Sequence, residues 1–313
     1  MSQFRHRTYL LTGTLLTGML VAFFLAVLSG GAKARAEVLP TGDPVLAAAG
    51  DIADCTSPND EATADLLANM PGATVATLGD NAYPDGSASD YKNCYTPSWG
   101  AYKDFGDGSP RTLPTAGNHD YMTAGASGYF GYFGAAAGDP TKGYYSYELG
   151  SWHMVVLNSN CTKVGGCTAT SPQVQWLKSD LSAHRSASCT LAYWHEPRFS
   201  SVQTGLRLGA FWNVLYKNGA DVVLNGHQHN YERFAPQSPS GALDTAKGIR
   251  EFVVGTGGET LHPFTTTIMA NSQVREASTF GVLKLTLHAN SYDWQFVPVA
   301  GQSFTDSGTT NCH

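Results

Sequence analysis

Short apolar runs alternate with amphipathic stretches along most of the chain, a pattern typical of an α/β fold. Six apolar runs predict buried strands: Val45–Ala49, Thr74–Leu78, Val155–Leu157, Thr190–Trp194, Val222–Leu224 and Phe252–Val254. Three amphipathic stretches predict helices: Asp60–Met70, Pro172–His184 and Leu206–Asn218. Two stretches of alternating polarity predict hairpins: Gly143–Asn158, and Phe280–Val299 with a turn near Asn290.

Residues at the expected helix ends support these boundaries. Ser171 is expected as the N-cap, with Pro172 at the first helical position, and Gly219 as the C-cap of the following helix. The segment Gly79–Pro110 directly follows the predicted strand Thr74–Leu78. It is rich in Asp, Gly, Ser and aromatic residues and predicts a long loop. Loops of this length in compact domains are usually functional.

The N-terminus has the composition of a secretory signal. Arg5 and Arg7 precede the apolar stretch Met19–Leu28, and Ala34-Arg35-Ala36 provides a cleavage site. We therefore expect residues 1–36 to be a cleaved signal peptide and residues 37–313 to form one catalytic domain. The alternative is an uncleaved membrane anchor, because residues 10–28 are interrupted only by Thr and Gly. The expected location is extracellular.

Composition narrows the class of protein further. The chain is 42% hydrophobic and 14% charged with 34 glycines, which excludes a disordered chain or a coiled coil. A single long apolar run excludes a polytopic membrane protein. Residues 1–36 hold four of the 19 basic residues and no acid, so their removal changes the formal charge from −6 to −10. Such a surface does not favour nucleic acid as a partner.

All six cysteines lie after the expected cleavage site. An even count in an exported chain favours disulfides over metal thiolates. Cys161 and Cys167 flank a turn-like Lys-Val-Gly-Gly segment and are the expected pair. Cys55–Cys94 and Cys189–Cys312 would then remain, although sequence alone leaves their connectivity open.

Polar fragments follow several of the predicted strands. They are Gly50-Asp51, Gly79-Asp80-Asn81-Ala82-Tyr83, Gly117-Asn118-His119-Asp120, Trp194-His195 and Gly226-His227-Gln228-His229. Each fragment alone fits an ordinary turn or a buried histidine. Together they provide carboxylate, phenol, amide and imidazole groups, a donor set that suits Fe, Zn or Mn. The number of donors favours two metal ions.

The order of these fragments over residues 50–229 resembles the binuclear metallophosphoesterases, and within them the purple acid phosphatases. Tyr83 is the position that distinguishes purple acid phosphatases from the wider superfamily. The stretch from His227 to Arg233 also resembles that family's His-x-His-x-Tyr-Glu-Arg segment. The resemblance implies a β-sandwich of two mixed sheets flanked by α-helices, with the metal site at the strand ends.

The resemblance also implies a role for each residue. Fe(III) would be bound by four side chains: Asp51, Asp80, Tyr83 and His229. A divalent ion (Fe, Zn or Mn) would be bound by Asp80 as a bridge and by three further side chains: Asn118, His195 and His227. His119 would face the substrate and protonate the leaving oxygen, so the expected catalytic residues are Asp80, Asn118 and His119.

Three departures from the family pattern qualify the resemblance. Ala53 stands where many relatives carry glycine, and we expect only a local backbone change there. The segment after His195 lacks the second substrate-facing histidine that many relatives have, which gives His119 more of the acid catalysis. About eight residues separate the expected cleavage site from the first strand, so the N-terminal β-domain of the large plant enzymes is not expected.

The remaining polar residues have simpler interpretations. His153, His184, His288 and His313 are expected to be structural or solvated. His262 follows a glycine-rich loop and is also expected to be structural, although the loop is long enough to reach the mouth of the site.

The expected function is that of a secreted metal-dependent phosphatase, an acid phosphatase-like hydrolase of small phosphate monoesters in which a metal-bound hydroxide attacks in line. Two alternatives remain open: a phosphodiesterase with the same dimetal site, and a non-catalytic metal-binding surface protein. A membrane partner is expected only if the N-terminal segment is not cleaved. The sequence leaves the oligomeric state and the physiological substrate open.

Overall fold

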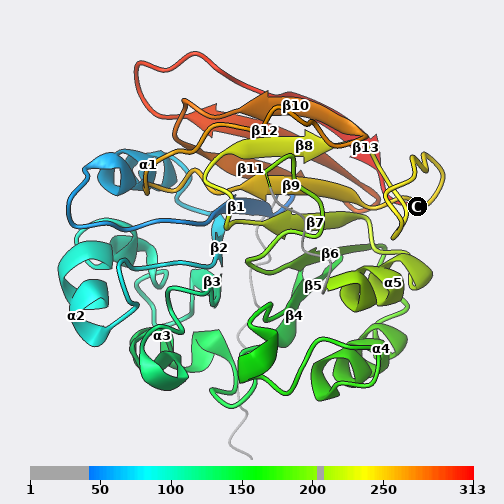
Figure 1. Ribbon diagram of the computed structural model, residues 1–313, viewed down its shortest axis with the longest axis horizontal. Helices are drawn as coiled ribbons and strands as arrows, with labels where there is room; N and C mark the ends of the chain where they lie inside the picture. Colours follow the sequence, from blue (N-terminus) through cyan, green and yellow to red (C-terminus); the bar gives the residue numbers. More distant parts are fainter. Residues whose placement is uncertain (1–41, 203–207) are drawn as a thin grey trace, which may run out of the picture. The chain divides into compact units, whose positions relative to one another are not determined.

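The computed structural model describes residues 42–202 and 208–313, which lie in one compact unit (Figure 1). The expected signal peptide, residues 1–36, lies outside the described residues. The described part contains two β-sheets. The six-stranded sheet has the order β13 (Ser307–Asn311), β12 (Ser291–Pro298), β11 (Gly281–Leu287), β1 (Val45–Ala49), β2 (Thr74–Leu78), β3 (Thr112–Thr115). The seven-stranded sheet has the order β10 (Ser272–Glu276), β8 (Tyr231–Phe234), β9 (Arg250–Val254), β7 (Val222–Asn225), β6 (Cys189–Tyr193), β5 (Trp152–Val156), β4 (Tyr145–Leu149).

Both sheets are mixed, as the sequence predicted. Strands β1, β2 and β3 are parallel, and β11, β12 and β13 extend their sheet in antiparallel fashion. Strands β5, β6, β7 and β9 are parallel, with antiparallel β4 on one side and β8 and β10 on the other. The parallel strands of each sheet bring their carboxyl ends to one edge, which is where the polar fragments of the sequence emerge.

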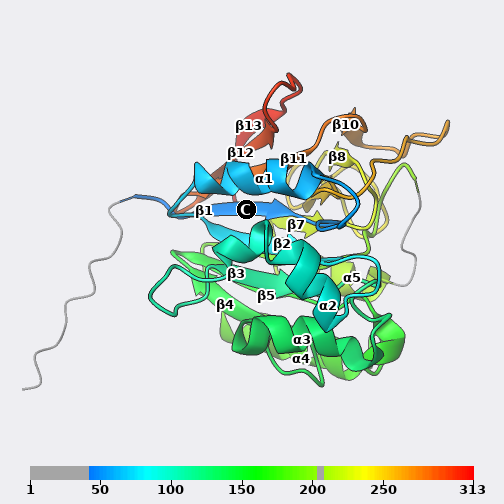
Figure 2. The same ribbon diagram turned by 90° about the vertical axis from the view of Figure 1, so that its left-hand side faces the viewer.

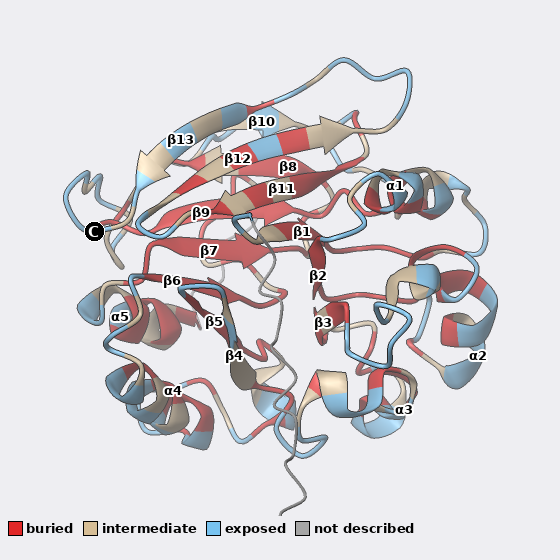
Figure 3. Ribbon diagram, turned by 180° about the vertical axis from the view of Figure 1, so that it is seen from behind, coloured by how far each residue is buried: buried red, intermediate tan, exposed pale blue. Residues whose placement is uncertain are grey.

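Alternation along the parallel strands builds two hydrophobic layers. In β6, Leu191 and Tyr193 belong to the core between the two sheets, whereas Ala192 belongs to a second cluster on the opposite face. In β9, Phe252 and Val253 divide in the same way. Because these strands are covered on both faces, they appear in the sequence as continuous apolar runs. Figure 3 shows strands such as β7 and β9 buried, whereas β13 and the outward faces of the helices are partly exposed.

Helices cover the outer faces of the sheets. Helices α4 (Pro172–Ala183) and α5 (Gly209–Lys217) lie side by side and pack on the second cluster (Figure 1). Helix α1 (Asn59–Ala68) lies beside β11, and the short helix α2 (Ala88–Asp90) lies beside α3 (Ser127–Phe133) (Figures 1 and 2). Among the described residues, no helix has the length and apolarity that a membrane span requires.

The predicted strands and hairpins are present, and the helix ends differ slightly. Helix α5 ends at Lys217 and Asn218 is its C-cap, so the predicted C-cap Gly219 comes one residue later, with a φ of 73°, a left-handed conformation that glycine favours. Ser171 precedes α4 as expected, but its hydroxyl donates to the Thr168 carbonyl rather than capping the helix. Residues 206 and 207 of the predicted third helix lie outside the described residues.

The prediction of an irregular loop at Gly79–Pro110 is wrong in part. Besides α2, the segment contains short helical turns at Tyr91–Tyr95 and Trp99–Tyr102. Ser87 and Asp90 form a reciprocal capping box that starts this helical run. Tyr91 and Tyr95 then pack against the rings of α3 with centroid distances of 4.9–5.7 Å. Aromatic packing therefore orders a segment whose polar composition suggested a loop.

The three expected disulfides are confirmed. The structure joins Cys55 to Cys94, Cys161 to Cys167, and Cys189 to Cys312. The first bridge ties the segment after Asp51 to the segment after Tyr83, and both segments border the strand-end site.

Candidate metal centre

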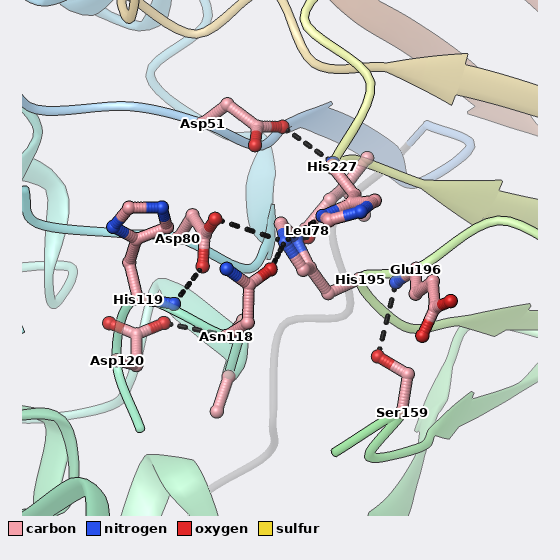
Figure 4. A network of polar contacts seen from close by, with 12 residues as sticks. Asp51, Leu78, Asp80, Asn118, His119, Asp120, Ser159, His195, Glu196 and His227 are labelled. Atoms are coloured by element: carbon pink, nitrogen blue, oxygen red, sulfur yellow. Dashed lines mark hydrogen bonds and ion pairs between the residues drawn. The ribbon is translucent and has the colours of Figure 1, made fainter. Parts of the chain in front are cut away.

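Five of the predicted site residues follow five different strands at one edge of the two sheets. Asp51 follows β1, Asp80 follows β2, Asn118 follows β3, His195 follows β6, and His227 follows β7. Figure 4 shows these five side chains converging. The two remaining predicted ligands, Tyr83 and His229, come from the segments after Asp80 and His227 and join the same group through the contacts described below.

The backbone at three of these positions is unusual. Asp51, Asp80 and His227 have φ angles of 59°, 50° and 68°, the left-handed region that non-glycine residues seldom occupy. Each such conformation costs about 1–3 kcal/mol and persists where the surroundings enforce it. The strain turns each side chain sharply away from its strand and into the common group.

The neighbouring glycines keep the group compact. A Cβ atom at Gly117 would collide with the Asp80 carboxylate, and one at Gly226 would lie 2.7 Å from Asp51 Oδ2. A Cβ atom at Gly79 would lie 2.6 Å from the His195 ring. At these three positions glycine is therefore required because another member of the group passes close to the backbone.

One half of the group surrounds the Tyr83 phenol. The phenol oxygen lies 3.3 Å from each of three acceptors: Asp51 Oδ1, Asp80 Oδ2 and His229 Nε2. His229 Nε2 lies 3.3 Å from Asp51 Oδ1 as well. The single phenol proton can satisfy only one of these acceptors. Asp51 is fully buried and Asp80 nearly so, and although burial lowers the pKa of His229, the charge and hydrogen bond of Asp51 raise that pKa to about 9, so this group favours a positive charge.

The other half surrounds the His195 imidazole. His195 Nε2 lies 3.1 Å from Asp80 Oδ2, 3.1 Å from Asn118 Oδ1 and 3.2 Å from His227 Nδ1. Donor atoms of Asp80, His195 and His227 all lie within 4.8 Å of one another. Asp80 Oδ2 belongs to both halves and therefore has the position of a bridging carboxylate.

The spacing of these atoms fits metal coordination. Metal–nitrogen and metal–oxygen bonds of about 2.0–2.2 Å place neighbouring donor atoms roughly 3 Å apart. The observed separations of 3.1–3.3 Å match this spacing. The donor set, which contains oxygen and nitrogen and no sulfur, suits Fe, Zn or Mn.

Backbone carbonyls orient two of the imidazoles toward the group. His195 Nδ1 donates to the Leu78 carbonyl at 2.8 Å, and His229 Nδ1 donates to the Thr260 carbonyl at 2.8 Å. A proton fixed on Nδ1 leaves the lone pair of Nε2 directed at the other donors. This is the usual outer arrangement of metal-binding histidines.

The pKa values show where a cation is needed. Burial alone would raise the pKa of Asp80, but the charge and hydrogen bond of His195 hold that pKa at about 2. Burial would lower the pKa of His195, whereas Asp80 raises that pKa to about 10. Burial and the carboxylates of Asp51 and Asp80 raise the pKa of the Tyr83 phenol far above its usual value. In the ion-free protein a proton on His195 therefore balances the carboxylates, and a bound cation would reverse this balance.

Ala53 holds the backbone beside the Tyr83 half of the site. Ala53, which replaces the family's glycine, donates its N–H to the Asn81 carbonyl and accepts from the Tyr83 N–H at 2.8 Å. These two bonds join the segment after Asp51 to the Tyr83 segment; whether they differ from the backbone of relatives with glycine stays a prediction.

His119 lies at the border of the group. Its backbone N–H donates to Asp80 Oδ1 at 2.7 Å, while its side chain turns away, with Nδ1 2.6 Å from the Pro84 carbonyl oxygen. The ring lies against Tyr83 with a centroid distance of 4.5 Å. Figure 4 shows the His119 ring on the side of Asp80 opposite to His195.

Sequence reasoning assigned no role to Asp120, which the structure places beneath the site. Asp120 is fully buried and accepts hydrogen bonds from the Gly117 N–H at 2.8 Å, from Asn81 Nδ2 at 3.0 Å and from the Tyr91 hydroxyl at 2.6 Å. It fixes the turn that presents Asn118 and His119. The aspartate directly after the Gly-Asn-His fragment was the available signal.

The loop that contains His262 reaches the site, contrary to the simpler interpretation. The His262 ring stacks on His229 with a centroid distance of 4.6 Å and an angle of 13° between the planes. The His262 N–H also donates to the His229 carbonyl at 2.8 Å. His262 thus lines the outer side of a predicted metal ligand.

The fold places the protein in a known class. It matches a purple acid phosphatase from yellow lupin (Lupinus luteus) seeds with a TM-score of 0.68 and 17% sequence identity, over 86% of this chain and 53% of that chain. It also matches GAP50, the anchor in the inner membrane complex of Plasmodium, with a TM-score of 0.66 and 15% identity, over 87% of this chain and 90% of that chain. Two mixed sheets flanked by helices therefore form a metallophosphoesterase fold.

The chain belongs to the calcineurin-like phosphoesterase family, whose model matches residues 29–231. It is 28% identical over 200 residues to purple acid phosphatase 15 of Arabidopsis thaliana, covering 54% of this chain and 37% of that protein. It is 26% identical over 203 residues to purple acid phosphatase 1 of Ipomoea batatas, covering 59% of this chain and 41% of that protein. These matches span about two fifths of the length of either relative.

Proposed function

We propose that this protein is an exported, binuclear metal-dependent phosphatase that hydrolyses small phosphate monoesters. One observation carries the proposal. Asp80 Oδ2 lies within 3.3 Å of both the Tyr83 phenol oxygen and His195 Nε2, so one buried carboxylate joins two groups of metal donors. The intact donor set favours an enzyme over a non-catalytic protein that keeps only the fold.

Each ion would have its own set of ligands. Fe(III) would be held by the four side chains around the phenol: Asp51, Asp80, Tyr83 and His229. A divalent Fe, Zn or Mn would be held by the four around the imidazole: Asp80, Asn118, His195 and His227. When bound, the two ions supply an activated water molecule at acidic to neutral pH and polarise the phosphoryl group.

The charge of the loaded site would attract the substrate. Asp51, Asp80 and a Tyr83 phenolate contribute three negative charges, fewer than the five positive charges of a trivalent and a divalent ion. The remaining positive charge would hold a phosphate ester although the chain as a whole is acidic, with a formal charge of −6. His119, which lies beside the group without belonging to it, would protonate the leaving oxygen.

The disulfides support export. Three bridges use all six cysteines, and such bridges form in oxidising compartments. Together with the signal-like composition of the N-terminus, they favour an extracellular location.

An activity assay combined with metal analysis tests the proposal. We expect purified protein to contain both ions and to hydrolyse p-nitrophenyl phosphate with a higher kcat/KM than bis(p-nitrophenyl) phosphate. The reverse preference would indicate a phosphodiesterase with the same metal site. A fully metal-loaded protein that hydrolyses neither ester would indicate a non-catalytic metal-binding protein.

Tyr83→Phe tests the assignment of iron. A phenolate bound to Fe(III) absorbs visible light by charge transfer, so the iron-loaded wild-type protein should be coloured and the variant colourless. Tyr121→Phe is a matched control. The hydroxyl of this nearby tyrosine accepts a hydrogen bond from Asn158 Nδ2 at 2.8 Å, and within the described part of the chain it bonds to none of the proposed ligands. A visible band that persists in Tyr83→Phe, measured on protein with equal iron content, would contradict the assignment.

A further inference from the structure

A second cluster of metal-binding side chains lies at the opposite end of the seven-stranded sheet. Glu148 is the second-to-last residue of β4, His153 lies near the start of β5, and His184 follows the last residue of α4. One donor atom from each of these three lies within 4.8 Å of the others. His153 pairs with Thr190, and five residues of about 3.3 Å each separate Thr190 from His195, so the cluster lies about 17 Å from the strand-end site.

The two imidazoles are oriented as metal ligands usually are. His153 Nε2 lies 2.7 Å from Asp180 Oδ2, and Asp180 Oδ1 in turn accepts from the Ser146 hydroxyl. His184 Nδ1 donates to the Asp180 carbonyl at 2.8 Å. These outer bonds leave the remaining nitrogen of each ring facing the Glu148 carboxylate, at 2.7 Å from His153 Nδ1 and 3.9 Å from His184 Nε2. A carboxylate behind a histidine is a common second layer of metal sites.

We propose that Glu148, His153 and His184 bind a divalent transition-metal ion, with Zn²⁺ as the best fit. Two imidazoles and one carboxylate are a typical zinc donor set, and solvent would supply a fourth ligand. Glu148 and His184 line a surface hollow of about 250 Å³, which gives the ion access from water. This site is distinct from the strand-end group and shares no residue with it.

Charge balance favours the ion. Glu148 and Asp180 carry two negative charges beside His153, whose side chain is 1% exposed. A divalent ion with two neutral imidazoles would balance the two carboxylates.

Binding requires one rearrangement. The rings of His153 and His184 are now stacked, with a centroid distance of 4.1 Å and an angle of 14° between their planes. His184 is 39% exposed, so its ring can turn and bring Nε2 toward the ion, whereas the buried His153 stays in place. The ion would then join the β4–β5 hairpin to the C-terminal end of α4 and stabilise this end of the domain.

Zinc titration of the metal-loaded protein tests the site. We expect the wild-type protein to bind one further equivalent of Zn²⁺, His184→Gln to lose it, and phosphatase activity to be equal in both. Asp180→Asn should weaken zinc binding by about 10–100-fold, as loss of an outer partner does. His288→Gln is the matched control, because this partly exposed histidine also lies between two carboxylates, Asp43 at 2.6 Å and Asp293 at 3.1 Å, but no second histidine lies beside it among the described residues.

Variants of the cluster separate a metal site from an ion-paired cluster. The charged or titratable groups that face His153 are Glu148 from β4 and Asp180 and His184 from α4 and its end. Wild-type and His184→Gln proteins that bind equal zinc, or a further equivalent lost equally in His288→Gln, would overturn the proposal. A His153→Gln variant that binds the further equivalent as tightly as the wild-type protein would overturn it too, since His153 would then not be a ligand.

Discussion

Asp80→Ala is expected to lose both metal ions and, with them, nearly all phosphatase activity. The Asp80 carboxylate contributes Oδ2 to both donor groups, at 3.3 Å from the Tyr83 phenol oxygen and 3.1 Å from His195 Nε2. Its removal takes one ligand from each proposed ion and leaves the remaining acceptors of both groups without their shared partner. Elemental analysis of the purified variant measures this loss directly.

His195→Ala separates the bridge from an ordinary ligand. His195 makes polar contacts with Asp80, Asn118 and His227. In the described part of the chain it makes none with Tyr83 or His229. This variant should therefore lose mainly the divalent ion and keep iron and its colour. Asp85→Ala, at an exposed aspartate five residues after Asp80, should retain both ions. Equal metal content in Asp80→Ala and His195→Ala would contradict the assignment of the bridge.

The sequence was most informative where strands are buried on both faces. Val45–Ala49 and Thr74–Leu78 were predicted with the bounds that the structure has, because an apolar run of five residues that ends at Gly-Asp is short for a helix and typical of a buried strand. Strands such as β10 and β13 were missed because they are polar and at most partly buried, so they lack an apolar pattern. Their order in the sheets depends on pairing with distant strands, which local sequence does not encode.

In the candidate site, too, local sequence predicted some features and the tertiary fold decided others. Its residue types could be predicted from short fragments, since each fragment lies at a strand end and the carboxyl ends of parallel strands meet. The contacts between Tyr83 and His229, 146 residues apart, and the support that Asp120 gives to Asn118 and His119 depend on the tertiary fold. The sequence predicts that His153 and His184 are structural or solvated, because only the folded chain brings them to the same carboxylate.

His119→Ala is expected to lower kcat by about 10²–10⁴-fold while metal content stays unchanged. Among the described residues, the only hydrogen bond from His119 to the bridging carboxylate is that of its backbone N–H, which donates to Asp80 Oδ1 at 2.7 Å. An alanine at this position keeps the bond. The side chain is held by the Pro84 carbonyl at Nδ1, so Nε2 is the atom available to a substrate. Removal of the ring should therefore affect proton transfer rather than metal binding.

The leaving group distinguishes acid catalysis from binding. An alkoxide needs a proton as it departs, whereas p-nitrophenolate is stable without one, so the loss should be large for alkyl phosphates and small for p-nitrophenyl phosphate. His262→Ala is the matched control, because this exposed histidine also borders the site but stacks on His229, with a centroid distance of 4.6 Å. Glu196 is a poorer candidate for the acid, since Figure 4 shows its side chain beyond His195 and its backbone N–H bonded to Ser159. If His119→Ala loses both activities equally, His119 binds phosphate or supports the loop, and if His262→Ala instead shows the dependence on leaving group, the acid is His262.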